Sequence, residues 1–187
     1  MTWRQALAAI VLLTAPSAAR ADAPIENFLG HWRGVEVNVG GAEEAPKLSP
    51  ADLDMAITEE NGGFRVRGLA LGRQPDGSVA PRQMDATLAP TDTPGVFAFE
   101  QGDGGLLSSL FADPAVGNPL EGDTLLWARV AGETLHVYSL AIDQAGGYAL
   151  EHATGELTGD GMVTRHELRL ENDRVVTVEG QLERAGD

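Results

Sequence analysis

Two histidines in the last third of the chain are the residues whose types and spacing come nearest to a chemical site. His166 lies in the stretch 162–170, where apolar and charged residues alternate, and this period of two places it on the apolar face of a strand. His152 lies in the stretch before it, so the turn between them decides how they are related. A three-residue loop at 159–161 would make them diagonal neighbours on one face, about 7–8 Å apart at Cα, whereas a two-residue loop would move His152 to the outer face.

A metal or haem site at this pair would need a third group, for which Glu36 is the candidate. We favour the alternative, in which each histidine is satisfied separately by hydrogen bonds or solvent, and we predict no metal and no cofactor. The sequence holds no nucleophile elbow, phosphate-binding loop, dinucleotide fingerprint or complete calcium loop, and His166-Glu167 starts like a zinc-protease motif without its second histidine. Because nothing completes a nucleophile–base or acid–base set, an enzyme is the least favoured class of function.

The elements that must position these side chains are short strands. Stretches rich in Val, Leu, Ile, Thr and aromatic residues alternate with turns of Gly, Pro, Asn and Asp, which is typical of an all-β domain. Short turns imply that sequence neighbours pair as antiparallel hairpins, and closure of the sheet would remove its two open edges. We therefore predict a single antiparallel meander barrel of about ten strands, at 31–39, 52–60, 63–71, 82–89, 95–101, 123–130, 133–142, 147–157, 162–170 and 174–183.

One segment, 102–122, interrupts this rhythm and is predicted to be a short helical lid or a loop. Leu106, Leu107, Leu110 and Phe111 would share one face of a short helix. The favoured interpretation is a packed loop whose apolar side plugs one end of the barrel, and the alternative is a mobile gate over a cavity.

The first 21 residues are typical of an export signal. Arg4 gives a basic start, an apolar run of ten follows at 6–15, and Ala-Arg-Ala at 19–21 fits the cleavage pattern. A buried N-terminal helix fits this pattern less well. We place the cleavage before Asp22, which leaves one domain over 22–187. The apolar run is too short to span a bilayer, so we expect no transmembrane segment in the mature chain.

The chain is acidic and has no cysteine. It carries 28 Asp and Glu against 13 Lys and Arg, a formal net charge of −15, which becomes −17 when Arg4 and Arg20 leave with the signal. This charge argues against nucleic acid or an anionic membrane surface as partner. The lack of cysteine excludes lipoprotein acylation, thiolate zinc sites and thiol catalysis. We expect a protein free in a bacterial periplasm, with secretion as the alternative.

The stretch FLGHWRGVEV, residues 28–37, opens the first predicted strand with the tripeptide Gly30-His31-Trp32. Together with the size, the export signal and the hairpin meander, it resembles the start of the calycin barrels, the lipocalins and fatty-acid-binding proteins. The resemblance implies that Trp32 closes the barrel floor and that a basic residue near the end of the last strand, Arg184 by position, packs over it. The second and third lipocalin motifs are not evident.

The first predicted strand leaves two orientations open. Trp32, Gly34 and Glu36 share one face by alternation, and Val35 and Val37 share the other. If Trp32 points inward, Glu36 lines the interior; if the valines do, Trp32 anchors an edge. A bulge at Gly34 would switch faces midway and reconcile both, and this is the interpretation we favour.

The favoured function is a periplasmic β-barrel that binds a small, largely apolar molecule, since a barrel of this size can enclose a cavity. The alternative is a filled barrel that meets a periplasmic protein partner through its acidic exterior or the 106–111 patch. The candidates for the cavity, with no distinction between lining and plug packing, are Trp32, Glu36, Phe64, Val66, Trp127, Tyr138, Leu150, His152 and His166.

Overall fold

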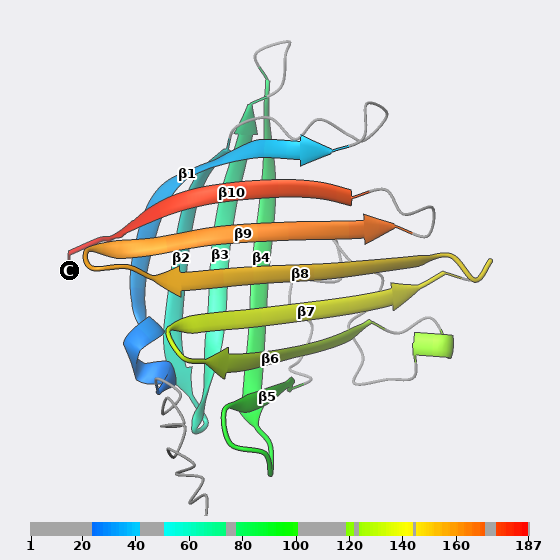
Figure 1. Cartoon of the computed structure of the whole chain (residues 1–187), viewed down its shortest axis with the longest axis horizontal. Helices are drawn as coiled ribbons and strands as arrows, with labels where there is room; N and C mark the ends of the chain where they lie inside the picture. Colours follow the sequence, from blue (N-terminus) through cyan, green and yellow to red (C-terminus); the bar gives the residue numbers. More distant parts are fainter. Residues whose placement is uncertain are drawn as a thin grey trace, which may run out of the picture.

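Ten antiparallel strands close into a barrel in the computed structural model of the chain (Figure 1). The structure describes residues 24–41, 51–73, 78–100, 119–121, 124–143, 145–170 and 175–186. Each strand pairs with its neighbours in sequence, and β1 pairs with β10 to complete the ring, so the predicted meander barrel is confirmed. The strands are β1 (Gly30–Gly41), β2 (Ala51–Glu60), β3 (Gly63–Arg73), β4 (Val79–Pro90), β5 (Val96–Phe99), β6 (Leu125–Ala131), β7 (Thr134–Ile142), β8 (Tyr148–Leu157), β9 (Gly161–Leu170) and β10 (Val175–Arg184).

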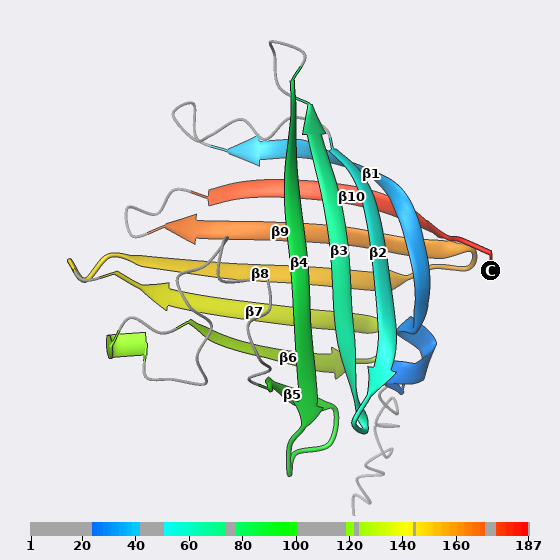
Figure 2. The same ribbon diagram turned by 180° about the vertical axis from the view of Figure 1, so that it is seen from behind.

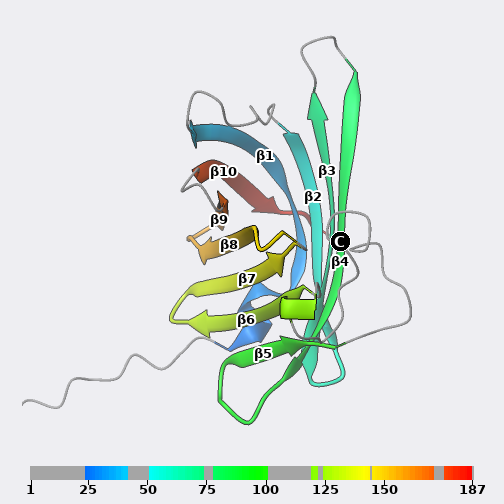
Figure 3. The same cartoon turned by 90° about the vertical axis from the view of Figure 1, so that its right-hand side faces the viewer.

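The barrel has two sides whose strands run in different directions. Figures 1 and 2 show β2, β3 and β4 crossing the strands from β6 to β10 at a steep angle on the opposite side of the molecule. Figure 3 separates the two layers and shows β1 bending from one to the other. The interior of the barrel lies between these layers, and the inward-facing residues of both fill it or line it.

Strand β1 follows regular alternation through Gly34, and the bulge predicted there is wrong. Its register with β2 runs without interruption from Gly30 to Glu36, and its pairing with β10 shifts only beyond Asn38. Gly34 instead marks a close approach: a Cβ at this position would lie 1.9 Å from the carbonyl oxygen of Gln181 on β10. A glycine lets the backbones of β1 and β10 approach closely at this position, with no extra residue in the strand.

Regular alternation settles the orientation of β1. Trp32 and Glu36 face the interior, and the Trp32 side chain is only 1% exposed. Val35 and Val37 lie on the outer surface, 48% and 43% exposed. The strand therefore presents its aromatic and acidic residues inward and its valines to solvent, because no bulge switches the faces.

One end of the barrel is closed by a packed core around Trp32. The short 3-10 helix η1 (Ile25–Phe28) lies at this end, and Trp32 Nε1 donates a hydrogen bond to the carbonyl oxygen of Phe28 at 3.0 Å. Phe64 and Phe97 belong to the same core and meet edge to face with ring centroids 5.0 Å apart. We call this the closed end, and it sets the floor beneath the remaining interior.

Arg184, near the end of β10, joins this floor to the N-terminal turn. Its guanidinium carbon lies 4.3 Å from the centroid of the Trp32 ring, a cation–π contact. The same guanidinium donates to the carbonyl oxygens of Asn27, at 3.0 Å, and Leu29. A basic residue over the tryptophan is the packing that the resemblance to lipocalins implies at this position.

Two sequence predictions fall outside the described residues. These are the export signal at 1–21 and the apolar face formed by Leu106, Leu107, Leu110 and Phe111. Of the predicted lid at 102–122, only η3 (Pro119–Glu121) is described. Within the described ranges, no helix combines the length and the apolar composition needed to cross a membrane.

Candidate functional site

A cavity of about 330 Å³ lies inside the barrel, between the closed end and the opposite rim. This volume falls at the lower end of the range of about 300–1,000 Å³ that is usual for small-molecule sites. Most of the lining is aliphatic or thioether side chains that face inward from both layers. This apolar part comprises Leu53, Met55, Ile57, Val66, Ala70, Met84, Ala86, Leu88, Leu126, Leu135, Val137, Ala153 and Met162.

Polar side chains gather on the cavity wall nearer to the rim than Trp32 is. They come from β1, β4, β7, β8 and β9, which belong to both layers of the barrel. A cavity with an apolar inner part and polar side chains nearer the rim suits a molecule that is itself apolar at one end and polar at the other. The polar band, as we call this set, is Glu36, Arg82, Ser139, Glu151, Thr164 and His166.

Glu36 and Arg82 form an ion pair within the polar band. Arg82 Nη2 lies 3.4 Å from Glu36 Oε2, and the Glu36 side chain is 15% exposed. Strands β2 and β3 separate β1 from β4 in the ring, so the contact bridges side chains that are not on adjacent strands. A single long contact leaves unused hydrogen-bonding capacity on both partners, since a carboxylate can accept a bidentate pair from arginine.

Glu151 and His166 form the second charged contact of the band. Glu151 Oε2 lies 3.7 Å from His166 Nε2, which is too long for a hydrogen bond. Ser139 lies directly opposite Glu151 on β7 and is buried. The three side chains place an acid, an imidazole and a hydroxyl on adjoining positions of the same wall.

Thr164 carries a buried polar atom that no described group satisfies. Its Oγ1 has no hydrogen-bond partner among the described residues. The residue opposite it on β10 is Gly180, which in turn lies opposite Glu36 on β1. A Cβ at Gly180 would lie 2.5 Å from Thr164 Oγ1 and 3.0 Å from Glu36 Cγ. The glycine thus leaves room for these two side chains to lie close together inside the barrel.

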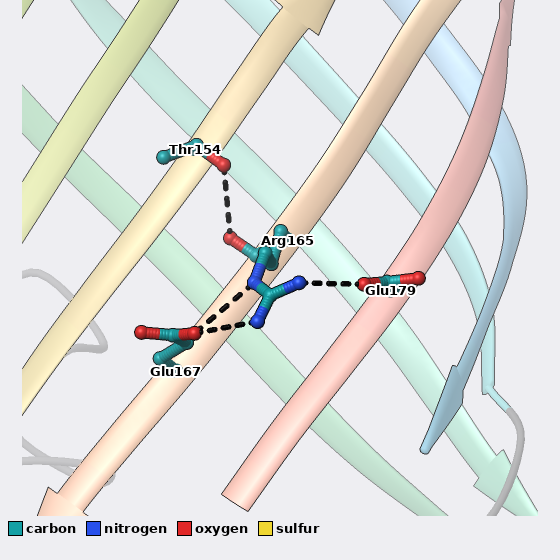
Figure 4. Close-up of polar contacts among 4 residues, drawn as sticks. All are labelled: Thr154, Arg165, Glu167 and Glu179. Carbon is teal, nitrogen blue, oxygen red and sulfur yellow. Dashed lines mark hydrogen bonds and ion pairs between the residues drawn. The ribbon is translucent and has the colours of Figure 1, made fainter. Parts of the chain in front are cut away.

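Arg165 also borders the cavity, but its guanidinium is engaged elsewhere. Figure 4 shows it between Glu167 and Glu179, with nitrogen–oxygen distances of 2.8 and 2.9 Å, while its backbone oxygen accepts a hydrogen bond from Thr154. The hydrogen bond from Arg165 holds the pKa of the Glu167 carboxyl below its usual range. The charge of Arg165 is therefore balanced on the outer surface and does not serve the cavity.

The structure distributes the nine predicted cavity candidates among three places. Glu36, Val66 and His166 line the cavity. Trp32 and Phe64 are buried in the core of the closed end. The other four lie on strand positions that alternate with the lining positions and do not reach the cavity; they are Trp127, Tyr138, Leu150 and His152.

The β8–β9 turn explains why His152 is not beside His166. Thr158 and Gly161 exchange backbone hydrogen bonds of 2.9 and 3.3 Å, so the loop between them has two residues. In the resulting register Ala153 lies opposite His166, and His152 faces the outer surface. Of the two loops considered from the sequence, the two-residue one is present, and it separates the histidines.

Trp127, Tyr138 and His152 do come together, but outside the barrel. They are successive cross-strand partners on β6, β7 and β8, with ring centroids 5.1 and 4.5 Å apart and nearly parallel planes. His136 extends the group, because its Nδ1 lies 3.0 Å from His152 Nε2. We call these four residues the outer aromatic row.

Both histidines of the outer aromatic row favour the neutral form. Burial, then the positive fields of His152 and Arg129, lower the pKa of His136. Burial also lowers the pKa of His152, against the opposing field of Glu167. Within the described part of the chain, no three His, Asp or Glu side chains are grouped as a metal site requires.

Sequence reasoning missed four members of the polar band. Ser139 and Glu151 follow from the inward position of His166 once the two-residue turn is known, and Thr164 lies two residues before His166 on the same face. Arg82 has no comparable local signal, because its contact with Glu36 depends on how the whole ring closes.

Comparisons with known proteins bear on the fold. No protein-family model matches the sequence, and no curated protein matches it either. Among solved structures, the barrel is similar to the S-type phycobiliprotein lyase CPES from Guillardia theta, with a TM-score of 0.57 and 10% sequence identity. The match covers 90% of this chain and 96% of the lyase chain. At this level of identity the likeness shows a shared barrel fold.

Proposed function

We propose that this protein binds a small, largely apolar molecule inside its barrel. The observation that carries the proposal is the cavity of about 330 Å³, which has an apolar inner part and a polar band toward the rim. A barrel whose only role is to present its outer surface to a partner needs no such space, because protein interiors are otherwise close-packed. The full-length similarity to a phycobiliprotein lyase supports a barrel architecture that is compatible with a small-molecule role.

Burial of apolar surface would supply most of the affinity. Displacement of water from aliphatic walls is worth about 25 cal/mol per Å² of apolar area, and the loss of ligand freedom offsets part of it. The packed closed end gives the ligand a fixed floor, so the inner wall is largely preformed. The polar band would then orient the ligand rather than dominate its affinity.

A neutral fluorescent probe tests this proposal directly. N-phenyl-1-naphthylamine is apolar and brightens when it leaves water, so titration should give saturable binding at one site per chain. Ala153→Phe adds a ring at the cavity wall and should weaken probe binding at least tenfold, whereas Ala98→Phe at an exposed position of β5 should leave it unchanged. Native mass spectrometry of protein purified from its own host should also reveal a retained molecule. Equal binding by both variants, or no saturable binding, would contradict the proposal.

We also propose export to the periplasm, with secretion as the alternative. The support is the basic start, apolar run and small-x-small site within the first 21 residues. Edman sequencing of the protein recovered from the periplasmic fraction should begin at Asp22. Recovery of protein that retains Met1 in the soluble fraction would contradict export.

A further inference from the structure

We propose that the molecule held in the cavity carries a positively charged, hydrogen-bond-donating head group, an amine or ammonium, that Glu151 and Glu36 receive at the polar band. This inference rests on the proposed function and adds the chemical class of the ligand. It follows from three properties of the band: unfilled acceptors, the balance of charge, and the space kept open beside them.

The carboxylates of the band have acceptor capacity that the described residues do not fill. Glu151 has one described polar contact, with His166 at 3.7 Å, and this is too long for a hydrogen bond. Glu36 has one, from Arg82 at 3.4 Å to Oε2. An ionised carboxylate offers about four lone-pair sites, so both retain oxygens that a donor on a ligand can reach.

The charge of the described residues on the cavity wall is also unbalanced. Two carboxylates, Glu36 and Glu151, face one guanidinium, Arg82, while the guanidinium of Arg165 is held by Glu167 and Glu179 outside (Figure 4). His166 adds a positive charge only when it is protonated. A carboxylate at the edge of an apolar cavity is costly unless it is paired, so a cationic head gains more there than a neutral one.

The wall beside Glu36 is shaped to admit a polar group. Thr164 Oγ1 is buried without a described partner, and Gly180 has no side chain to separate it from Glu36. A hydroxyl can accept a hydrogen bond from an ammonium that a carboxylate already holds. Because the aliphatic lining lies on the closed-end side of the band, the apolar part of such a molecule would point toward Trp32.

The test compares three ligands that share one chain and differ only in the head group. Decylamine, decanol and decanoate are titrated at pH 8 against the protein loaded with N-phenyl-1-naphthylamine, below the concentration at which they form micelles. Decylamine should displace the probe at least tenfold more tightly than decanol, and decanoate should be the weakest. The neutral probe and decanol report on the cavity itself, so they test the proposed function separately from the head group.

Matched variants assign the preference to the band. Glu151→Gln keeps the size of the side chain and removes its charge, so the amine preference should fall at least fivefold while decanol binding is unchanged. Glu36→Gln provides a second variant should the first fail to fold. Glu156→Gln is the control, because it removes the same charge from an exposed position of the same strand.

Each other outcome overturns the inference. Tightest binding by decanoate would assign the head group to Arg82 and require an anionic ligand. Equal binding of all three would show that the band does not select charge, and the proposed function would still stand. Failure of decanol and the neutral probe to bind at all would remove the proposed function as well. An amine preference that Glu156→Gln reduces as much as Glu151→Gln would assign it to the overall acidity of the protein.

Discussion

Both faces of β6, β7 and β8 carry polar side chains, and the surroundings of these side chains differ. On the inner face, Ser139 and Glu151 adjoin a cavity and have few described polar partners. On the outer face, Tyr138 and His152 stack with ring centroids 4.5 Å apart, and His152 Nε2 has a hydrogen-bond partner in His136 Nδ1 at 3.0 Å. Hydrogen-bonding groups without described partners beside a cavity point to a ligand, whereas the residue types alone do not.

Trp32 and Trp127 show the same contrast between the interior and the outer surface. Trp32 is 1% exposed, donates a hydrogen bond to Phe28 and lies under Arg184. Trp127 is only partly buried and stacks on Tyr138 at the outer surface. Of these two residues, Trp32 belongs to the core of the closed end and supports the floor of the interior.

The largest expected difference between the interior and the outer surface comes from removing the rings of Trp32 and Trp127. Trp32→Ala should lower the free energy of unfolding by about 3–5 kcal/mol, the usual cost of emptying a buried aromatic site. Trp127→Ala should cost only about 0.5–1.5 kcal/mol, which is the range for one aromatic stacking contact. Urea unfolding monitored by circular dichroism measures both. Equal losses would mean that the outer row supports the fold as much as the closed end does.

The next largest loss of stability should come from a substitution where β1 pairs with β10, which we call the seam. Gly34→Ala puts a Cβ 1.9 Å from the Gln181 carbonyl oxygen and should cost about 1–3 kcal/mol or more, because backbone must move. Gly72→Ala is the matched control, since its Cβ would meet only the Ala80 carbonyl oxygen at 3.5 Å. Thermal unfolding of both variants distinguishes them. A Gly34→Ala protein as stable as the control would show that the seam tolerates a side chain.

The histidines of the outer aromatic row should make stability depend on pH near neutrality. Because the pKa values of His136 and His152 are lowered in the folded protein, the unfolded chain binds more protons just below its histidine pKa of about 6.5. Stability should therefore fall as the pH drops from about 7.5 to about 5.5, by roughly a few tenths of a kcal/mol per pH unit for partly exposed groups.

The double variant His136→Gln/His152→Gln identifies the source of this slope. Urea midpoints measured across the same pH range should vary less than in the parent protein. The carboxyls with lowered pKa values, Asp54, Asp85 and Glu167, destabilise the fold only at more acidic pH as they become protonated. An unchanged slope in the double variant would assign the pH dependence to other groups.

The smallest expected effect belongs to the exposed ion pairs of Figure 4. Arg165 contacts Glu167 and Glu179, but half of its side chain is exposed, so solvent screens both pairs. Arg165→Gln should leave the thermal midpoint within measurement error at physiological salt and should not alter probe binding. A clear loss of probe affinity would show that this guanidinium does influence the cavity.

The strands and their closure were predictable because their signals are local. Turns such as Asn61-Gly62 specify hairpins, and alternation marks the strands they connect, so ten strands were placed within a few residues. The faces of β1 were less predictable. Glycine at position 34 fits a bulge and a close backbone approach equally well, and only the position of Gln181 on β10 decides between them.

The candidate site was only partly predictable, for two physical reasons. One residue more or less in the β8–β9 loop exchanges the faces of β8, so His152 and Glu151 trade places between surface and cavity. The contact between Glu36 and Arg82 joins strands three positions apart in the ring, and its existence depends on barrel size and shape. Neither the choice of loop nor the width of the interior is encoded by a short pattern.

The pairing of β1 with β10 also has a consequence for how the chain folds. Arg184 reaches the carbonyl oxygen of Asn27, 157 positions earlier, so the ring cannot close until nearly the whole chain is available. Every other strand pair joins sequence neighbours and can form locally. The pairing of β1 with β10 is therefore the step with the highest entropic cost of loop closure. During synthesis β1 emerges before its partner β10, with Val35 and Val37 along an unpaired edge. The interval before closure is therefore when this barrel is most exposed to aggregation and has most need of chaperones.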